Sequence, residues 1–246
     1  MPKSLADNAY QQIKDWIVHY YLKPGARLHV KDLTQALGIS QTPVREALSM
    51  LEKENLIDRE PQKGFRVKSL SMQDIEDLYD LRIALEVLSA RQAAQRITLS
   101  DRKRMTSLLS KVGRLIESGN KQGILELEQD YHTIILEASG NKALEDMGRT
   151  ILDRIWIIQN INLLTTDHLS DVHPQHLSVF EAIKNGDSQK AGLLMARHLT
   201  IAKEFVISRL KRSDDILSNL MGFPFPRAQG VLRKGNVRGR SIRPRP

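Results

Sequence analysis

Four side chains in the second half of the chain have the types and spacing of a metal site. Glu128 and His132 are four residues apart, so both point from one face of a helix. His176 lies ten residues before Gly186, which belongs to a turn, and His198 lies twelve residues after it. On antiparallel helices these two histidines lie roughly 15 and 18 Å from the turn, at similar heights. Three imidazoles and a carboxylate suit Zn²⁺, Ni²⁺ or a similar divalent ion.

Each histidine also has an ordinary explanation, because a lone helical histidine is more often a hydrogen-bonded or surface residue. Asp130 lies on roughly the opposite helix face from Glu128 and is a poor substitute for it. His173 is an alternative ligand, although Pro174 indicates that it precedes its helix. A metalloenzyme is a rival interpretation, and it would need an open metal position and an acid–base group. The two Glu-x-x-His motifs of di-iron bundles are absent.

A second group of polar side chains lies in the first turn of a helix that Ser40 can cap. Gln41 suits adenine, and Arg45 suits guanine or a phosphate. Ser40 and Thr42 suit phosphate oxygens at a helix N-terminus. Alternatively, Ser40 is only a cap and Arg45 only a surface ion-pair partner. Further DNA-backbone contacts are expected from Lys31, Lys63 and Gly64.

The elements around this turn are those of a winged helix-turn-helix. A capped helix begins at Ser4, a run at 27–30 alternates like a short strand, and Gly38 ends a compact second helix. After the third helix, the β-prone runs 56–59 and 64–67 form a hairpin. We therefore predict a winged helix-turn-helix in residues 1–70, a small α+β domain with another partner being the alternative. The apolar positions expected to face its core include Leu5, Ala9, Ile13, Ile17, Val44, Ala47, Leu48 and Leu51.

Residues 71–213 are predicted to form an antiparallel all-α bundle of about six helices, which makes the fold class mainly α. Turn residues at 118–120, 139–141 and 185–187 separate helical patterns. The helices are expected at 71–97, 100–118, 121–138, 141–164, 173–185 and 187–212.

The net charge of +8 is a poor guide to partners, because a short C-terminal segment carries most of it. Residues 1–70 hold eleven basic against eight acidic side chains, and residues 71–221 hold nineteen against twenty-one. Residues 222–246 hold seven basic side chains and no acidic one. This segment is rich in Pro, Gly and Arg, so we predict a disordered basic tail over 214–246. A non-specific nucleic-acid binder driven by the tail would lose most of its affinity when the tail is deleted.

The cellular setting follows from what the sequence lacks. The chain contains no cysteine, no apolar stretch of a signal peptide and no apolar run of about 18 residues. We expect a cytoplasmic protein without a membrane partner.

The N-terminal motifs resemble those of the GntR family of bacterial transcriptional regulators. The resemblance runs from Lys23-Pro24-Gly25 through Ser40-Gln41-Thr42-Pro43-Val44-Arg45-Glu46-Ala47-Leu48 to Lys63-Gly64-Phe65-Arg66-Val67. It implies a winged helix-turn-helix that reads a double-stranded DNA operator. The family usually has Arg where this chain has Gln41, so the preferred operator is expected to differ at that contact or to be bound more weakly.

The region 72–212 resembles the FCD-type ligand-binding domain of the FadR subfamily. The resemblance rests on Leu81-Arg82-Ile83-Ala84-Leu85-Glu86, Tyr131-His132, Gly186-Asp187 and Arg197-His198-Leu199. It implies a divalent metal on Glu128, His132, His176 and His198, beside a pocket for a small organic acid. The family acid is usually Asp, so the longer Glu128 is expected to shift the metal. Arg82 is a candidate clamp for the effector carboxylate, or else the i+4 partner of Glu86.

Together these features predict a transcriptional regulator rather than an enzyme. Two subunits of a homodimer would each place a recognition helix in one half of a roughly palindromic operator. An effector would change the relative placement of the two recognition helices.

Overall fold

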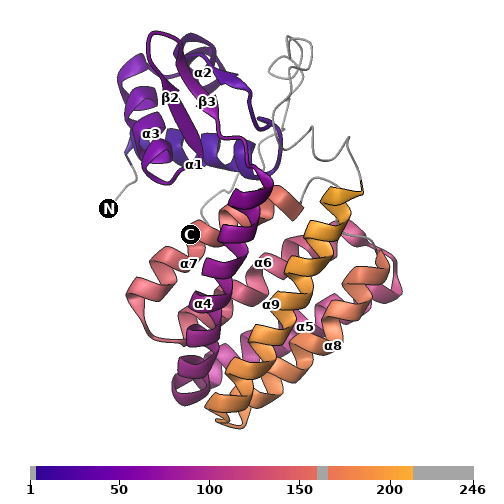
Figure 1. The fold of residues 1–246 in the computed structure, drawn as a ribbon. Coiled ribbons are helices and arrows are strands. Elements are labelled where there is room, and N and C mark those ends of the chain that lie inside the picture. The colour runs from indigo at the N-terminus through magenta and orange to yellow at the C-terminus, as the bar shows by residue number, and fades with distance from the viewer. Residues whose placement is uncertain (1–3, 160–165, 213–246) are drawn as a thin grey trace.

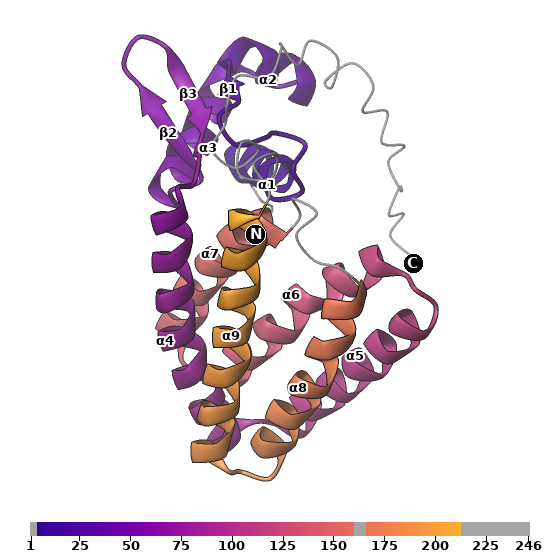
Figure 2. The same ribbon diagram turned by 45° about the vertical axis from the view of Figure 1, so that its right-hand side comes forward.

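The computed structural model describes residues 4–159 and 166–212, and Figures 1 and 2 show its fold. Its N-terminal part is three helices and a small sheet, which we call the winged helix. The predicted tail over 214–246 and the predicted helical residues 160–164 lie outside the described residues. The elements of the winged helix are α1 (Leu5–Val18), β1 (Arg27–Leu28), α2 (Val30–Leu37), α3 (Gln41–Lys53), β2 (Ile57–Glu60) and β3 (Gly64–Val67).

Local sequence signals fix where these elements begin and end. Ser4 and Asp7 form a reciprocal capping box, in which each side chain accepts from the other residue's backbone N–H. Gly38 ends α2 with φ of 67°, a left-handed conformation that costs glycine little. The sheet has the order β1-β3-β2 and is antiparallel throughout. The predicted strand and hairpin are therefore confirmed.

The core of the winged helix is formed largely by the apolar positions expected from the sequence. Ile13, Val44 and Leu48 have no exposed surface. Leu5 is the exception, because 61% of its surface is exposed. In the first turn of α1 the buried residue is Ala6, which faces a hollow shared with α3. The expectation that Leu5 lies in the core was therefore wrong.

The second part is the predicted helical bundle, confirming a mainly α fold. Ser71 and Asp74 form the capping box that begins its first helix. Pro174 lies inside a helix that already begins at Thr166, so the expectation that His173 precedes its helix was wrong. The proline lacks only its own N–H, and the helix continues on both sides of it. The helices are α4 (Met72–Arg96), α5 (Leu99–Glu117), α6 (Lys121–Ala138), α7 (Lys142–Gln159), α8 (Thr166–Lys184) and α9 (Ser188–Lys211).

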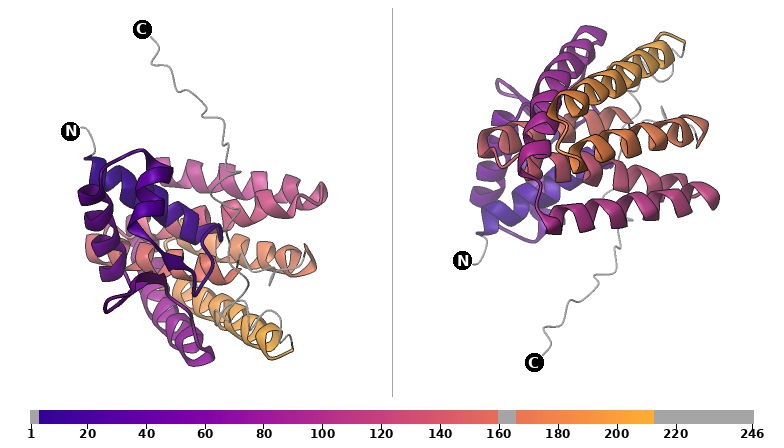
Figure 3. Two further views of the ribbon diagram at one scale, coloured as in Figure 1. Left: turned by 90° about the horizontal axis from the view of Figure 1, so that it is seen from above. Right: turned by 90° about the horizontal axis from the view of Figure 1, so that it is seen from below.

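The bundle helices pack in two layers, and the winged helix lies at one end of them. In the view from below, α4, α9, α8 and α5 lie side by side, with α6 and α7 behind them (Figure 3). The winged helix lies beside the start of α4 and the ends of α7 and α9 (Figures 1 and 2). Tyr20, which follows α1, packs against the apolar clusters of both parts. The two parts thus share a packed junction.

No helix among the described residues is long and apolar enough to cross a membrane.

Candidate functional site

The first turn of α3 presents the side chains proposed to read DNA. Ser40, Gln41, Thr42 and Arg45 are all exposed, whereas Val44 between them is fully buried. Ser40 occupies the N-cap position, but its side chain makes no capping hydrogen bond. Within residues 4–159 and 166–212, Arg45 forms no salt bridge, so the ion-pair alternative finds no support there. The turn therefore offers exposed donors beside a helix N-terminus.

The other proposed DNA contacts are also exposed. Lys31 lies in the first turn of α2, and Lys63 lies in the turn between β2 and β3. Gly64 has φ of 93°, and Gln62 before it has φ of 62°. A left-handed backbone at both positions bends the hairpin tightly, so Lys63 lies at its tip.

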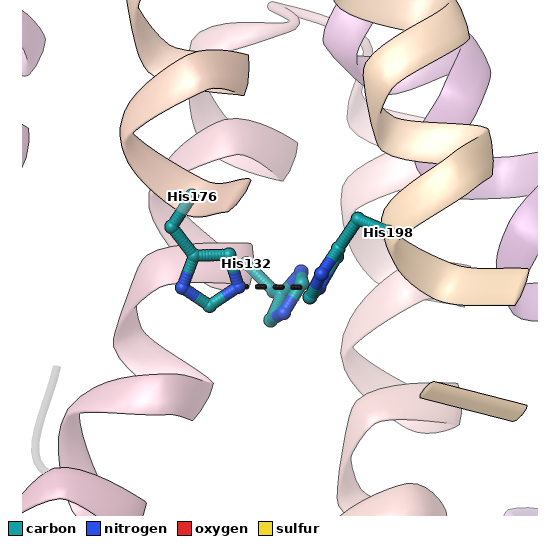
Figure 4. Close-up of side chains that lie close together, drawn as sticks. All are labelled: His132, His176 and His198. Carbon is teal, nitrogen blue, oxygen red and sulfur yellow. Dashed lines mark hydrogen bonds between the residues drawn. The ribbon is translucent and has the colours of Figure 1, made fainter. Parts of the chain in front are cut away.

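Three histidines from three helices converge inside the bundle (Figure 4). His132 lies on α6, His176 on α8 and His198 on α9, and at most 3% of any of these residues is exposed. Each offers one ligand atom, and these atoms lie within 4.8 Å of one another. The Nε2 atoms of His176 and His198 are 3.1 Å apart, so the two residues face each other across the turn as predicted. Two nitrogens bound to one tetrahedral Zn²⁺ would lie about 3.3 Å apart.

The second nitrogen of each imidazole faces an oxygen. His132 Nδ1 lies 2.5 Å from Glu86 Oε2. His198 Nδ1 lies 3.2 Å from Gln175 Oε1, and His176 Nδ1 lies 3.6 Å from Glu128 Oε1. Such outer oxygens fix the orientation of metal-binding histidines and leave Nε2 for the metal.

Burial sets the charge of this cluster. It lowers the pKa of His132, and it lowers the pKa of His176 well below its usual value, with help from the neighbouring histidines. Burial also raises the pKa of Glu128 to about 8, against the opposing attraction of Arg82. Glu86 behaves differently, because His132 and Arg82 outweigh burial and lower its pKa to about 2. Neutral imidazoles are the form that binds a metal, so the donor set fits a divalent ion.

The fourth proposed ligand is close but less well placed. Glu128 is buried, and it approaches Nδ1 of His176 rather than the converging Nε2 atoms. Asp130 is exposed, in agreement with its dismissal. His173, also on α8, faces α5, since its Nε2 would lie 3.7 Å from a Cβ on Gly113 of that helix. The structure thus brings together three of the four predicted ligands.

Arg82 makes the i+4 contact that was the alternative to effector binding. Its Nε donates to Glu86 Oε1 at 2.6 Å, and both side chains are almost completely buried. Arg82 also lines a small cavity of about 10 Å³ beside the histidines. That is room for about one water molecule, so an organic acid could enter only if side chains moved. The lining residues are Arg82, Glu128, Gln129, His132, Leu152, Ile155, Trp156 and Gln159.

Sequence reasoning missed two side chains that contact the cluster. The sequence indicates Glu86 only as the i+4 partner of Arg82, yet it contacts His132, 46 residues away. A carboxylate on the apolar side of α4 was the available signal. Gln175 gave no signal, since its contact with His198 depends on how α8 packs against α9.

This architecture defines a class of protein: a winged helix and a helical bundle with a buried polar cluster in one chain. The family model "Bacterial regulatory proteins, gntR family" matches residues 5–67, and the model "FCD domain" matches residues 77–200. The chain therefore belongs to the GntR family of bacterial transcriptional regulators, with an FCD domain in its second part. This confirms a regulator rather than a metalloenzyme.

Individual relatives agree with this assignment. The chain is 30% identical over 202 residues to the HTH-type transcriptional repressor GlaR of Escherichia coli, covering 78% of this chain and 91% of that protein. It is 29% identical over 187 residues to the HTH-type transcriptional regulator YdhC of Bacillus subtilis, covering 74% and 82%. The solved structure of Escherichia coli McbR/YncC has the same fold, with a TM-score of 0.75 at 23% identity, and the match covers 85% of this chain and 99% of that one.

Proposed function

We propose that this regulator reads a double-stranded DNA operator through the first turn of α3 and the hairpin tip. One observation supports this proposal: that turn carries exposed hydrogen-bond donors, while the other face of the helix is buried. Arg45 is the side chain assigned to a guanine or a phosphate. The residues assigned to DNA are Lys31, Ser40, Gln41, Thr42, Arg45, Lys63 and Gly64.

Selection of duplexes from a random library with the purified protein tests this assignment. For the best selected duplex, Arg45→Ala should cost about 1–3 kcal/mol of binding free energy, which is roughly 5- to 150-fold in Kd. Lys103→Ala is the matched control, because it removes one exposed positive charge from α5. Equal affinities of wild type and Arg45→Ala, with unchanged circular dichroism, would reject the assignment.

The protein is further proposed to act as a homodimer, with residues 1–70 binding DNA and residues 71–213 forming the sensor and dimer contacts. A palindromic operator needs two recognition helices, and one chain supplies one. On α4, Leu81 and Leu88 lie two turns apart on one face, with 41% and 42% of their surface exposed. Light scattering should give twice the chain mass, and a monomer at micromolar concentration would contradict the proposal. Access to chromosomal DNA implies action in the cytoplasm.

A divalent metal, Zn²⁺ or Ni²⁺, is proposed to bind His132, His176 and His198, with Glu128 as a further ligand. The convergence of three buried imidazoles supports this site. Bound metal would hold α6, α8 and α9 together and present a positive charge at the cavity wall. At a free metal concentration 100 times Kd, binding should stabilise the fold by about 2.7 kcal/mol and raise Tm by roughly 5–10 °C.

His176→Ala should abolish this rise in Tm, and His19→Ala should retain it. His19 is an exposed histidine that caps the C-terminus of α1, and it serves as the matched control. Calorimetric titration with zinc should give one site per chain in the wild type. Absence of zinc binding to wild type, or unchanged binding to His176→Ala, would contradict the metal assignment.

The effector is proposed to be a small organic acid that enters the cavity beside the metal site. Arg82 supplies a buried positive charge there. Trp156 also lines the cavity, and its buried indole N–H has no acceptor among the described residues. A thermal-shift screen of small carboxylates should find compounds that raise Tm of the zinc-loaded protein, and more weakly that of Arg82→Lys. A carboxylate that stabilises both proteins equally would exclude Arg82 from the effector site.

A further inference from the structure

A series of polar contacts connects the wall of the cavity with the winged helix. Gln129 of α6 lines the cavity and donates from Nε2 to Oδ1 of Asp153, at 3.1 Å. The other carboxylate oxygen of Asp153, on α7, lies 2.7 Å from Nζ of Lys14 on α1. The second contact crosses the junction where α1 lies against α7 (Figure 1).

The same lysine contacts the end of the recognition helix. Lys14 Nζ lies 2.9 Å from Oε2 of Glu54, which is the C-cap residue of α3. The Tyr10 hydroxyl donates to Oε1 of Glu54 at 2.5 Å and accepts from Lys14 at 2.9 Å. These contacts hold one end of α3, and the DNA-reading turn with Arg45 lies at the other.

The charged groups at this junction are shielded from water. The side chains of Lys14 and Asp153 are 15% and 17% exposed. Burial alone would lower the pKa of Lys14, but the attraction of Asp153 and three hydrogen bonds raise it above its ordinary value. The ammonium therefore stays charged, and its interaction energy depends strongly on where Asp153 lies.

We propose that these side chains form a polar relay that transmits occupation of the cavity to α3. The relay consists of Gln129, Asp153, Lys14 and Glu54. It deepens the proposed function, because it gives a physical path between the proposed sensor site and the proposed DNA contacts.

The cavity is built so that occupation should move the relay. Any ligand larger than water must displace lining side chains, and Gln129 is one of them. Leu152, the neighbour of Asp153 on α7, is another. Because α3 is a rigid rod about 20 Å long, a tilt of about 5° at its C-cap moves its first turn by about 1.7 Å. That displacement is large enough to misplace a bidentate contact to a base.

A double-mutant cycle in the full chain tests the relay without any ligand. Hydrogen–deuterium exchange is measured at the amides of 10–14 and 48–54 in Gln129→Leu, Lys14→Met and the double variant. In each single variant, these amides should exchange roughly five-fold faster than in wild type. A five-fold effect is the lower end of the coupling that is typical between two sites. The double variant should exchange no faster than Lys14→Met alone, because both substitutions break one path. Unchanged exchange in Gln129→Leu, or additive effects, would overturn the relay.

Two further variants guard against a general loss of stability. Lys203→Met breaks a more exposed lysine–aspartate pair between α9 and α4, with Asp80, and should leave exchange at 10–14 and 48–54 unchanged. Asp153→Asn keeps the size and the Gln129 contact but removes the charge, and it should reproduce the effect of Lys14→Met. Faster exchange in Lys203→Met to the same extent, or wild-type exchange in Asp153→Asn, would count against the relay.

A second experiment uses zinc, and it tests the relay separately from the metal site. Zn²⁺ alone should change exchange at 10–14 and 48–54 in wild type but not in Lys14→Met, although calorimetry shows zinc bound to both. Zinc that binds wild type without changing these segments, or that changes them equally in both proteins, would overturn the relay. If wild type binds no zinc, the proposed metal site is wrong, and the double-mutant cycle alone decides the relay.

Discussion

Replacing Glu86 with glutamine tests whether the buried polar cluster behaves as one unit. The Glu86 carboxylate contacts Arg82 at 2.6 Å and His132 at 2.5 Å. The side chains of all three are at most 4% exposed. Glutamine has the same shape but no charge, so the variant leaves the Arg82 guanidinium buried without its carboxylate.

The magnitude follows from this burial. Removing one partner of a buried ion pair typically costs about 3–5 kcal/mol, whereas an exposed pair contributes about 0–1 kcal/mol. Glutamine retains one acceptor oxygen, so we expect Glu86→Gln to lower the free energy of unfolding by about 3 kcal/mol. His132 also loses the carboxylate that orients it, which should weaken zinc binding roughly 10- to 100-fold.

Urea unfolding followed by circular dichroism measures the first effect, and calorimetric zinc titration measures the second. Asp80→Asn is the matched control on α4, since it neutralises a carboxylate that is 65% exposed and paired with Lys203. The control should change the free energy of unfolding by less than about 1 kcal/mol. A Glu86→Gln protein as stable as the control, with unchanged zinc affinity, would refute the description of this cluster as a coupled buried network.

Four further outcomes are expected from packing and backbone geometry. Leu48→Ala should lower the free energy of unfolding by about 2–5 kcal/mol in urea titrations, because a fully buried side chain would leave a cavity. Gly148→Ala should destabilise by about 1–3 kcal/mol, since the added Cβ would lie 2.5 Å from the buried Leu136. Gly192→Ala should destabilise less than Gly148→Ala in thermal melts, because its Cβ would meet Cγ, Cδ and Nε of Arg91, an exposed side chain that can turn away. Gly64→Ala should destabilise by about 1 kcal/mol, because its φ of 93° favours glycine.

Local features of the fold could be predicted from the sequence because their causes are local. The capping boxes at Ser4 and Ser71, the left-handed Gly38 and the hairpin all depend on residues within a few positions of each other. The sequence predicts too late a start for α8, because proline is typical of a helix boundary, whereas in the structure the helix continues through Pro174.

The candidate metal site was predictable in part, for a similar reason. Spacing along α6 and around one turn identified the histidines, and the structure brings His132, His176 and His198 together. The contacts that orient them join distant helices. Glu86 is 46 residues from His132, and Lys14 is 139 residues from Asp153. Sequence spacing carries no information about such pairs, because they depend on how whole helices pack.

The three histidines come from separate helices, and this has a consequence for the entropy of the chain. A metal bound by His132, His176 and His198 would close loops of 44 and 22 residues. Closing a loop of the smaller size restricts the unfolded chain by about 3 kcal/mol, as a disulfide would. In a chain without cysteine, such an ion would act as a reversible cross-link that reducing conditions do not break. Its removal would release this link between α6, α8 and α9.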